Sequence, residues 1–372
     1  MIAAEPKASL LATMPDELAS VLAEFGEKPF RAKQILEWVF KKRVESFELM
    51  RNLSKSLRTA LEERFTLRRM IFARVEGSRD TTRKYLFKLS DGRLVESVLI
   101  PASPALYGSR SDRRTLCVSS QVGCAYACAF CASGLAGFTR NLTADEIVEQ
   151  IVQVEKLSGE RVDNLVFMGM GEPLANLPAV LRAIEILNAE WGVSIGARHI
   201  TVSTSGLVPQ IRKLADFPLQ IRLAISLHGA SDEVRDRIMP VNRKWPLREL
   251  YLALEEWIGK KNQRLTIEYI LIDGVNDSRE QGRLLGRMAR ALGARVNLIP
   301  YNTVEGLPWK RPDEAQMEAF HDEVAACGVS ATLRREKGHD IAAACGQLRL
   351  KEETELGIIE APAKPKLQIT NH

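Results

Sequence analysis

Aromatic residues, histidines and long apolar runs are scarce in this sequence. Phe, Trp and Tyr make up 6% of the 372 residues, and there are five histidines and six cysteines. No run reaches the roughly 18 apolar residues of a membrane-spanning helix, so we expect no membrane partner. The first residues lack the pattern of a signal peptide, and three of the six cysteines fall in one loop instead of forming a disulfide framework. We therefore expect a cytoplasmic protein with a metal centre.

Hydrophobic content and charge set limits on the architecture. Hydrophobic residues make up 45% of the chain, which is enough for one large domain and a smaller one. The net charge is +5, but residues 27–75 contain thirteen Lys and Arg against six Asp and Glu. This excess favours a module that contacts a polyphosphate backbone. A solvated helical face rich in basic residues would give the same count, so that alternative stays open.

The first hundred residues predict short helices followed by a hairpin. Capping and early-proline patterns near Thr13 and Pro29 begin two helices, and leucines recur at helical spacing over residues 53–61. Apolar strands flank an Asp91-Gly92 turn, which is a strong hairpin pattern. We divide the chain into three parts: a helical module with a hairpin (1–100), a barrel (101–350) and a flexible tail (351–372).

Apolar strand patterns alternate with amphipathic helices from about residue 113 onward. The predicted strands are 115–119, 165–168, 199–204, 221–226, 265–271, 295–299 and 330–333. Such alternation implies parallel strands with right-handed crossovers, and an active site at the C-terminal rim. Six or seven units are too few to close an eight-stranded barrel. We therefore predict an α/β fold, an open partial (β/α)6 barrel of the TIM type with a small N-terminal helical module and hairpin.

Cys124, Cys128 and Cys131 form a C-x3-C-x2-C loop. Cysteine thiolates hold iron-sulfur clusters, usually four to a cluster, so three in one loop leave one corner for a small ligand. With Phe130 before the third cysteine, the loop is similar to that of the radical S-adenosylmethionine superfamily. The resemblance implies a [4Fe-4S] cluster and S-adenosylmethionine as cofactors. A zinc site lacking one ligand and a cluster used only for electron transfer are the alternatives.

Polar residues follow four of the predicted strands, at residues 169–173, 203–206, 226–228 and 297–302. The glycines of the first segment would let the backbone approach a ligand, and Glu172 would accept from its ammonium group. His228 has no second histidine at helical spacing, so we expect a neutral hydrogen-bonding role rather than metal binding. Four such segments at one rim beside the cysteine loop predict a cofactor site.

The chain as a whole resembles one family closely. The stretches that carry the resemblance are 28–31, 95–98, 116–124, 169–174, 202–206, 225–228, 267–269, 297–300 and 344–348. Over these stretches the sequence is similar to the RlmN-type radical methyltransferases, which methylate C2 of adenosine in ribosomal RNA. Ala127 stands where members often carry a polar residue, which concerns the hydrogen bonding of the loop and not its ligands.

The resemblance also implies residue roles. Cys345 would take a methyl group from one S-adenosylmethionine, and a radical made from a second would remove hydrogen from that S-methyl group. After carbon addition to the base, Cys117 would attack the sulfur of Cys345 and release the RNA, leaving a disulfide bond. Glu96 would be the proton acceptor, or a hairpin residue that orients another group. The residues that would contact S-adenosylmethionine are Gly171, Glu172, Ser203, Ser226, Leu227, His228 and Asn302.

The expected substrate is adenosine 2503 of 23S rRNA, with tRNA adenosine 37 as a further candidate. We expect an electron donor such as flavodoxin, and a monomer. The nearest alternative is the related Cfr type, which modifies C8 of the same adenosine with similarly arranged cysteines. An RNA-binding assembly factor with an inert iron-sulfur cluster is the alternative from a different class.

Overall fold

The described part of the chain folds around one open sheet of ten strands, in the order β14-β13-β12-β11-β10-β9-β6-β5-β4-β3. The computed structural model describes residues 7–77, 82–101, 113–135, 137–304, 306–334, 347–355 and 357. The strands follow one another across the sheet in chain order, so each new strand is added at the same advancing edge. Strands β3 and β14 lie at the two edges, and the predicted open partial barrel is confirmed.

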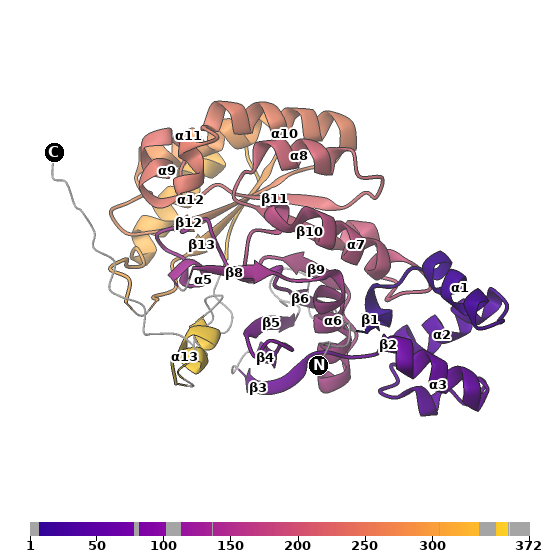
Figure 1. Cartoon of the computed structure of the whole chain (residues 1–372). Coiled ribbons are helices and arrows are strands. Elements are labelled where there is room, and N and C mark those ends of the chain that lie inside the picture. The colour runs from indigo at the N-terminus through magenta and orange to yellow at the C-terminus, as the bar shows by residue number, and fades with distance from the viewer. Residues whose placement is uncertain are drawn as a thin grey trace.

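The parallel part of the sheet contains all seven predicted strands, with ends within two residues of the prediction. They are β6 (Arg114–Cys117), β9 (Asn164–Phe167), β10 (Ile200–Thr204), β11 (Arg222–Ser226), β12 (Thr266–Leu271), β13 (Arg295–Pro300) and β14 (Ala331–Leu333). The crossover helices, seen on one side of the sheet in Figure 1, are α6 (Ala144–Ser158), α7 (Leu177–Asn188), α8 (Val208–Ala215), α10 (Leu247–Lys261), α11 (Arg279–Ala291) and α12 (Glu314–Ala326). The expected capping box of α6 is present at Thr143 and Glu146. Local capping and apolar periodicity therefore suffice to place these elements.

Three antiparallel strands extend the same sheet at its N-terminal edge: β3 (Ile71–Gly77), β4 (Arg83–Lys88) and β5 (Leu94–Pro101). The predicted hairpin joins β4 to β5, with Gly92 at a φ of 83° and the Arg93 N–H donating to Asp91 Oδ1. Strand β3 was not predicted, because it is an edge strand whose side chains are mostly exposed and show no burial pattern. Since β5 pairs with β6, the sheet crosses residue 100. The division of the chain there stays a prediction.

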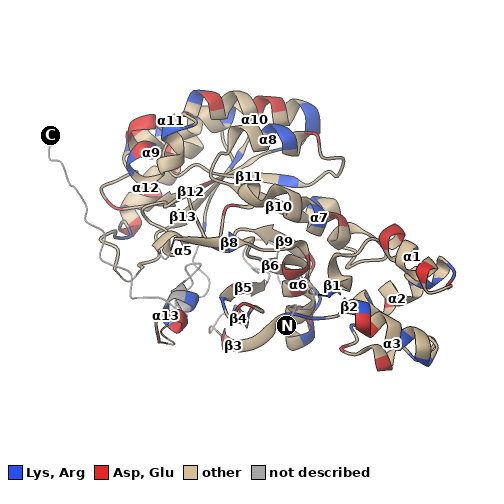
Figure 2. Ribbon diagram, in the orientation of Figure 1, with Lys and Arg blue, Asp and Glu red and all other residues tan. Residues whose placement is uncertain are grey.

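The N-terminal helices α1 (Pro15–Glu24), α2 (Phe30–Phe40) and α3 (Lys55–Arg64) form a group at one end of the molecule, beside α6 and α7 (Figure 1). Part of the basic excess attaches this group to the barrel, because Arg43 pairs with Glu155 and Arg69 with Asp145, both on α6. Figure 2 shows other Lys and Arg residues on the outer sides of these helices. The basic face is therefore smaller than the residue count suggests.

Helix α13 (Gln347–Glu355) packs against β5 and against α5 (Ala132–Leu135) (Figure 1). Both of these elements are far from α13 in the sequence. The helix crosses position 350, where the tail was predicted to begin. Cys345 and residues 358–372 lie outside the described residues. In the part of the chain that the structure describes, no helix combines the length and apolar character needed to span a membrane.

Candidate functional site

Four of the residues that the sequence predicts for the site lie on one face of the sheet. Side chains of a strand alternate between faces, and directly paired residues share a face. Val98 pairs with Cys117, so Glu96, two residues before Val98, shares the face of Cys117. The pairing continues through β9 to β10 and β11, and brings Ser203 and Ser226 to this same inner face. The opposite face is apolar and lies under the crossover helices.

The cysteine loop is framed by a small two-stranded sheet of β7 (Gln121–Gly123) and β8 (Phe138–Asn141). Gly123 has a φ of 78°, and a Cβ there would lie 1.9 Å from the carbonyl oxygen of Gly137. Glycine is therefore required where the loop leaves β7. Ala127 also has a positive φ, 47°, which is unfavourable for a residue with a Cβ. The loop between these strands is held in a tight conformation that presents its three thiols.

The three thiols lie near one another in surroundings that disfavour bare thiolates. Burial, with smaller contributions from the neighbouring Cys131 and Glu172, raises the pKa of Cys124 to about 12. Burial also raises the pKa of Cys128 well above its usual range, with Cys131 and Cys124 contributing. A bound cation deprotonates a coordinating thiol, so a positive iron centre would supply what this loop lacks.

The donor set of the loop fits an iron-sulfur cluster. Cysteine thiolates are the ligands of such clusters, and three of them leave one iron without a protein ligand. Among the described residues, no group of three His, Cys, Asp or Glu side chains has the geometry of a site for one metal ion.

Two hydrogen bonds hold the cysteine loop against the barrel, and neither can be predicted from the sequence. The Ala129 N–H donates to the carbonyl of Ile238, at the end of α9 (Asp232–Ile238), and the Trp309 indole donates to Ala129 O at 2.7 Å. Arg235 on α9 is fully buried and donates to the carbonyls of Leu227 and Ser205. It thereby joins the segments that follow β10 and β11.

Arg235 also influences the cysteine loop electrostatically. Burial lowers its pKa to about 10, while the charge of Cys128 acts in the opposite direction. Its local sequence, Asp232-Glu233-Val234-Arg235-Asp236, has the composition of an exposed helix and so gave no indication of a buried arginine. Because it donates to both carbonyls, Arg235 fixes the position of the two rim segments relative to each other.

The glycines of the 169–173 segment lie in close contact with the segment before the cysteine loop. A Cβ at Gly169 would lie 2.6 Å from Val118 O, and one at Gly171 would lie 2.4 Å from the Cβ of Gln121. Gly171 also has a φ of 95°. These glycines therefore let the chain pack against the segment before the cysteine loop.

Glu172 is buried and holds two loops together. Its Oε1 accepts from the Leu174 N–H at 3.0 Å, and its Oε2 accepts from both the N–H and the hydroxyl of Ser205 at 2.8 Å. Burial raises the pKa of this carboxyl, and the Ser205 and Leu174 hydrogen bonds oppose that effect. The carboxyl group also contributes to the electrostatics of Cys124, so it lies close to the cysteine loop.

His228 lies beside the cysteine loop in a buried, uncharged state. Its Nδ1 accepts from the Ile270 N–H at 3.0 Å, so Nδ1 carries no proton. Burial lowers its pKa to about 3, and the neighbouring Arg235 adds to this effect. Its ring meets Phe130 edge to face, with the ring centroids 4.9 Å apart. This geometry agrees with the expected neutral hydrogen-bonding role and places the ring proton on Nε2.

Other rim residues differ in what they can offer a ligand. Asn302 Oδ1 and Glu268 Oε2 are buried and have no hydrogen-bond partner among the described residues. The backbone N–H of Leu227 donates to Glu268 O, and the backbone carbonyl of Leu227 accepts from Arg235. Buried acceptors without partners are costly. Asn302 and Glu268 therefore suit the donors of a cofactor, and Glu268 was missed because it reads as an internal strand residue.

Glu96 lies on β5, away from the strand-end residues. Its Oε1 accepts from the Arg349 N–H of α13 at 2.5 Å, and its Oε2 lies 3.4 Å from the Lys84 ammonium. Its backbone carbonyl accepts from the hydroxyl of Ser119, two residues after Cys117. Cys117 is buried on β6, and Cys345 lies outside the described residues. The structure thus joins Glu96 to the strand of Cys117.

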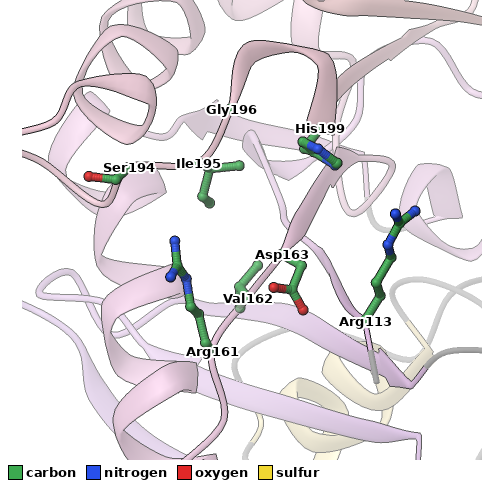
Figure 3. A pocket seen from close by; sticks show the side chains of 8 residues that line it. All are labelled: Arg113, Arg161, Val162, Asp163, Ser194, Ile195, Gly196 and His199. Carbon is green, nitrogen blue, oxygen red and sulfur yellow. The ribbon is translucent and has the colours of Figure 1, made fainter. Parts of the chain in front are cut away.

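A cavity of about 220 Å³ lies at the opposite end of the barrel, where β6, β9 and β10 begin (Figure 3). Its lining residues are Arg113, Arg161, Val162, Asp163, Ser194, Ile195, Gly196 and His199. They include none of the predicted site residues. The cavity is therefore separate from the cysteine loop and the rim.

The fold and the cysteine loop define a radical S-adenosylmethionine enzyme. The family model of the Radical SAM superfamily matches residues 118–281, which include the loop and the strand ends from β9 to β12. A second model, the ribosomal RNA large subunit methyltransferase N-terminal domain, matches residues 8–67. The cofactors are a [4Fe-4S] cluster and S-adenosylmethionine.

The chain belongs to the RlmN family. It is 55% identical over 350 residues to a probable dual-specificity RNA methyltransferase RlmN of Akkermansia muciniphila, covering 94% of this chain and 98% of the relative. The Bacillus subtilis relative with the same description is 46% identical over 343 residues, covering 91% and 92% of the two chains. A crystal structure of a radical SAM methyltransferase from Sphaerobacter thermophilus matches with a TM-score of 0.85 and 43% identity, covering 92% of this chain and 99% of that one.

Proposed function

We propose that this chain transfers a methyl group to C2 of an adenosine in RNA. The main substrate is adenosine 2503 of 23S rRNA, and adenosine 37 of tRNA is a second substrate. The dual-specificity RNA methyltransferase description of its relatives supports RNA as the substrate class. The observation that carries the proposal is that Glu96 and Cys117 share one face of the sheet with the strand-end serines of the cofactor rim.

The chemistry explains why a radical enzyme is needed. Adenine C2 lies between two ring nitrogens and is electron-poor, so it does not attack a sulfonium methyl group as an ordinary nucleophile. When bound, the cluster and S-adenosylmethionine would supply one-electron chemistry, namely the deoxyadenosyl radical and an acceptor for one electron from the base adduct. Cys124, Cys128 and Cys131 hold the cluster.

Two cysteines act in the transfer of the methyl group. The Cys345 thiolate attacks the methyl carbon of one S-adenosylmethionine, and S-adenosylhomocysteine leaves. Loss of a hydrogen atom to the deoxyadenosyl radical, which departs as 5′-deoxyadenosine, turns the S-methyl group into a methylene radical that bonds to C2. Glu96 takes the C2 proton as the adduct gives up its electron. Cys117 then attacks the sulfur of Cys345, the S–C bond breaks, and the released carbon takes up a proton to become the methyl group.

The rim residues bind the cofactor in this proposal. Glu172 and Ser203 face the methionine part, where a carboxylate and a hydroxyl match ammonium and carboxylate groups. Asn302 offers its unpartnered Oδ1 to the adenine amino group. The remaining contacts come from Gly171, Ser226, Leu227 and His228.

The N-terminal module holds the RNA. In the described part of the chain, exposed basic side chains on and near α2 and α3 that form no ion pair include Lys28, Lys33, Lys41, Lys42 and Lys55. Such residues track phosphates, while the target base is unstacked into the pocket. The protein acts in the cytoplasm as a monomer, and a flavodoxin-type protein donates the electron.

The experiment is anaerobic reconstitution of the chain with iron, sulfide, S-adenosylmethionine and a fragment of 23S rRNA, followed by nucleoside mass spectrometry. We expect 2-methyladenosine, with label from the methyl group passing through Cys345. Product at C8 would instead establish the Cfr type. A Cys345→Ala variant that still supports normal rRNA methylation in cells would contradict the cysteine relay and favour an assembly role.

A further inference from the structure

Four charged side chains are buried together where α13 meets the antiparallel strands. Lys84, Glu96, Arg349 and Glu353 are each at most 3% exposed. The Arg349 guanidinium lies 2.8 Å from Glu353 Oε2, and Lys84 Nζ lies 3.4 Å from Glu96 Oε2. Two cations thus face two anions with almost no solvent. We call these four residues the α13 ion cluster.

Backbone hydrogen bonds connect this cluster to the ends of two elements. Glu96 Oε1 accepts from the Arg349 N–H in the first turn of α13, and Glu353 Oε1 accepts from the Leu94 N–H at the start of β5. A carboxylate is favourable at the positive end of a helix. Each acid therefore binds a cation and a backbone donor of the element opposite, so the two elements have one relative position.

In the described residues, little apolar surface contributes to the attachment of α13 to the sheet. Among the described residues, Leu86 and Leu94 form a small buried apolar pair, separate from the large core, and the Leu94 N–H bonds Glu353 of α13. Leu86 pairs with Glu96 across β4 and β5, so these side chains share the inner face with the ion cluster. Among the described side chains, the contacts between α13 and the sheet are thus mainly those of charged groups.

Buried ion pairs are an expensive way to attach a helix. Desolvating the charges costs about as much as their attraction returns, and apolar replacements are often neutral or stabilising. Arg349 shows the cost, because none of its three guanidinium nitrogens makes a hydrogen bond of good geometry within the described residues. Such pairs are retained for specificity of position, as in coiled coils with a buried polar residue.

The position of α13 matters because of what lies next to it. The helix contacts β5, which carries Glu96, and α5, which begins directly after Cys131. It begins at Gln347, two residues after Cys345 in the sequence. Two residues span at most about 7 Å, so the placement of α13 limits the reach of that thiol. The ion cluster therefore positions the helix that directly follows the proposed methyl carrier in the sequence.

We propose that Lys84, Arg349 and Glu353 are positioning residues that hold α13, and through it Cys345, in register with Glu96 and the cysteine loop. The inference rests on the proposed cysteine relay. The acids and bases of the cluster do not touch the reacting atoms, apart from Glu96. Their effect is on the coupling between radical formation and carbon transfer.

The test compares two glutamate substitutions on the same helix. Glu353→Gln removes a buried charge, whereas the control Glu352→Gln removes a charge that pairs with the exposed Arg74. The measured quantity is the ratio of 5′-deoxyadenosine to methylated adenosine, with iron content and S-adenosylmethionine binding measured alongside. We expect the ratio to rise at least tenfold in Glu353→Gln and to stay at the wild-type value in Glu352→Gln, with both variants keeping their iron.

A second variant removes the danger that a stranded charge unfolds the protein. In Arg349→Met/Glu353→Met both charges are gone, so we expect a folded protein that still has the raised ratio and a reduced fraction of methylated Cys345 in intact mass spectra. A folded double variant with the wild-type ratio would overturn the proposal and leave the cluster a purely structural role. Wild-type protein that never methylates Cys345 would instead refute the relay itself.

Discussion

The hydroxyl oxygens of Ser203 and Ser226 lie 3.2 Å apart, where the neighbouring strands β10 and β11 end. Both serines are on the inner face, and parallel strands end at the same rim. Each hydroxyl has one proton and two acceptor sites, so a pair bonded to each other still has capacity for a third group. The pair is thus a ready partner for a polar ligand at the rim.

Removing either hydroxyl is expected to weaken S-adenosylmethionine binding. Ser203→Ala and Ser226→Ala each lose a hydrogen bond of about 1 kcal/mol, which corresponds to roughly a fivefold higher Kd. Equilibrium dialysis with the reconstituted protein measures this. Thr201→Val is the matched control, since Thr201 is on the same strand and face but two residues further from the rim. Unchanged affinity in both serine variants would remove them from the cofactor site.

Each cysteine of the loop is expected to be needed for iron. Ala at Cys124, Cys128 or Cys131 leaves only two thiolates, so the reconstituted variants should contain little iron and lack the visible absorption of the cluster. Cys327→Ala is the control, because Cys327 ends α12 and lies outside the loop. Full iron content in any one of the three loop variants would show that the ligand set is assigned incorrectly.

Arg235→Met is expected to destabilise the protein strongly. The carbonyls of Leu227 and Ser205 would lose their buried donor, at a total cost of about 3–5 kcal/mol. The lowered urea midpoint, at an unchanged slope, measures the loss. Arg237→Met is the control on the same helix, since Arg237 is exposed and lies over the Trp309 ring. Similar midpoints for the two variants would mean that Arg235 does not hold the rim.

Acid sensitivity is expected from His228. Its folded pKa, about 3, lies below the ordinary value of 6.5, so the unfolded chain binds the proton more readily. The stability that the neutral ring contributes is present above pH 6.5 and is lost as the pH falls toward 3. Between pH 6.5 and 5 the loss is about 2 kcal/mol.

The variant His228→Asn tests this pH dependence. Asn keeps an acceptor for the Ile270 N–H and tolerates the positive φ of 56°, but it does not titrate. We expect its free energy of unfolding to fall less steeply from pH 6.5 to 5 than that of the wild type. Parallel curves for the two proteins would assign the acid sensitivity to other groups.

The sequence predicted the elements whose physics is local. Strands β6 and β9 to β14, the hairpin turn at Asp91 and the capping box at Thr143 each depend on a few neighbouring residues. The three cysteines were predictable as a group because their spacing itself describes a loop. Strand β3 was missed because an edge strand of mostly exposed side chains has no periodic burial.

Contacts between distant residues were beyond local patterns. Glu96 and Arg349 are 253 positions apart, and nothing near either one indicates that a helix begins at this carboxylate. The close packing of Gly171 on Gln121 became apparent only in the three-dimensional structure. Buried charges such as Arg235 are likewise invisible in a sequence, because composition alone assigns them to the surface.

The unclosed sheet, with β3 and β14 at separate edges, decides how a polymer can be modified. A ring of strands would admit only molecules that enter end-on through its mouth, and an internal nucleotide is attached to its chain on both sides. An open sheet lets one base approach from the side while the neighbouring nucleotides stay outside. An engineered strand that bridged this gap should therefore exclude long RNA while still admitting S-adenosylmethionine.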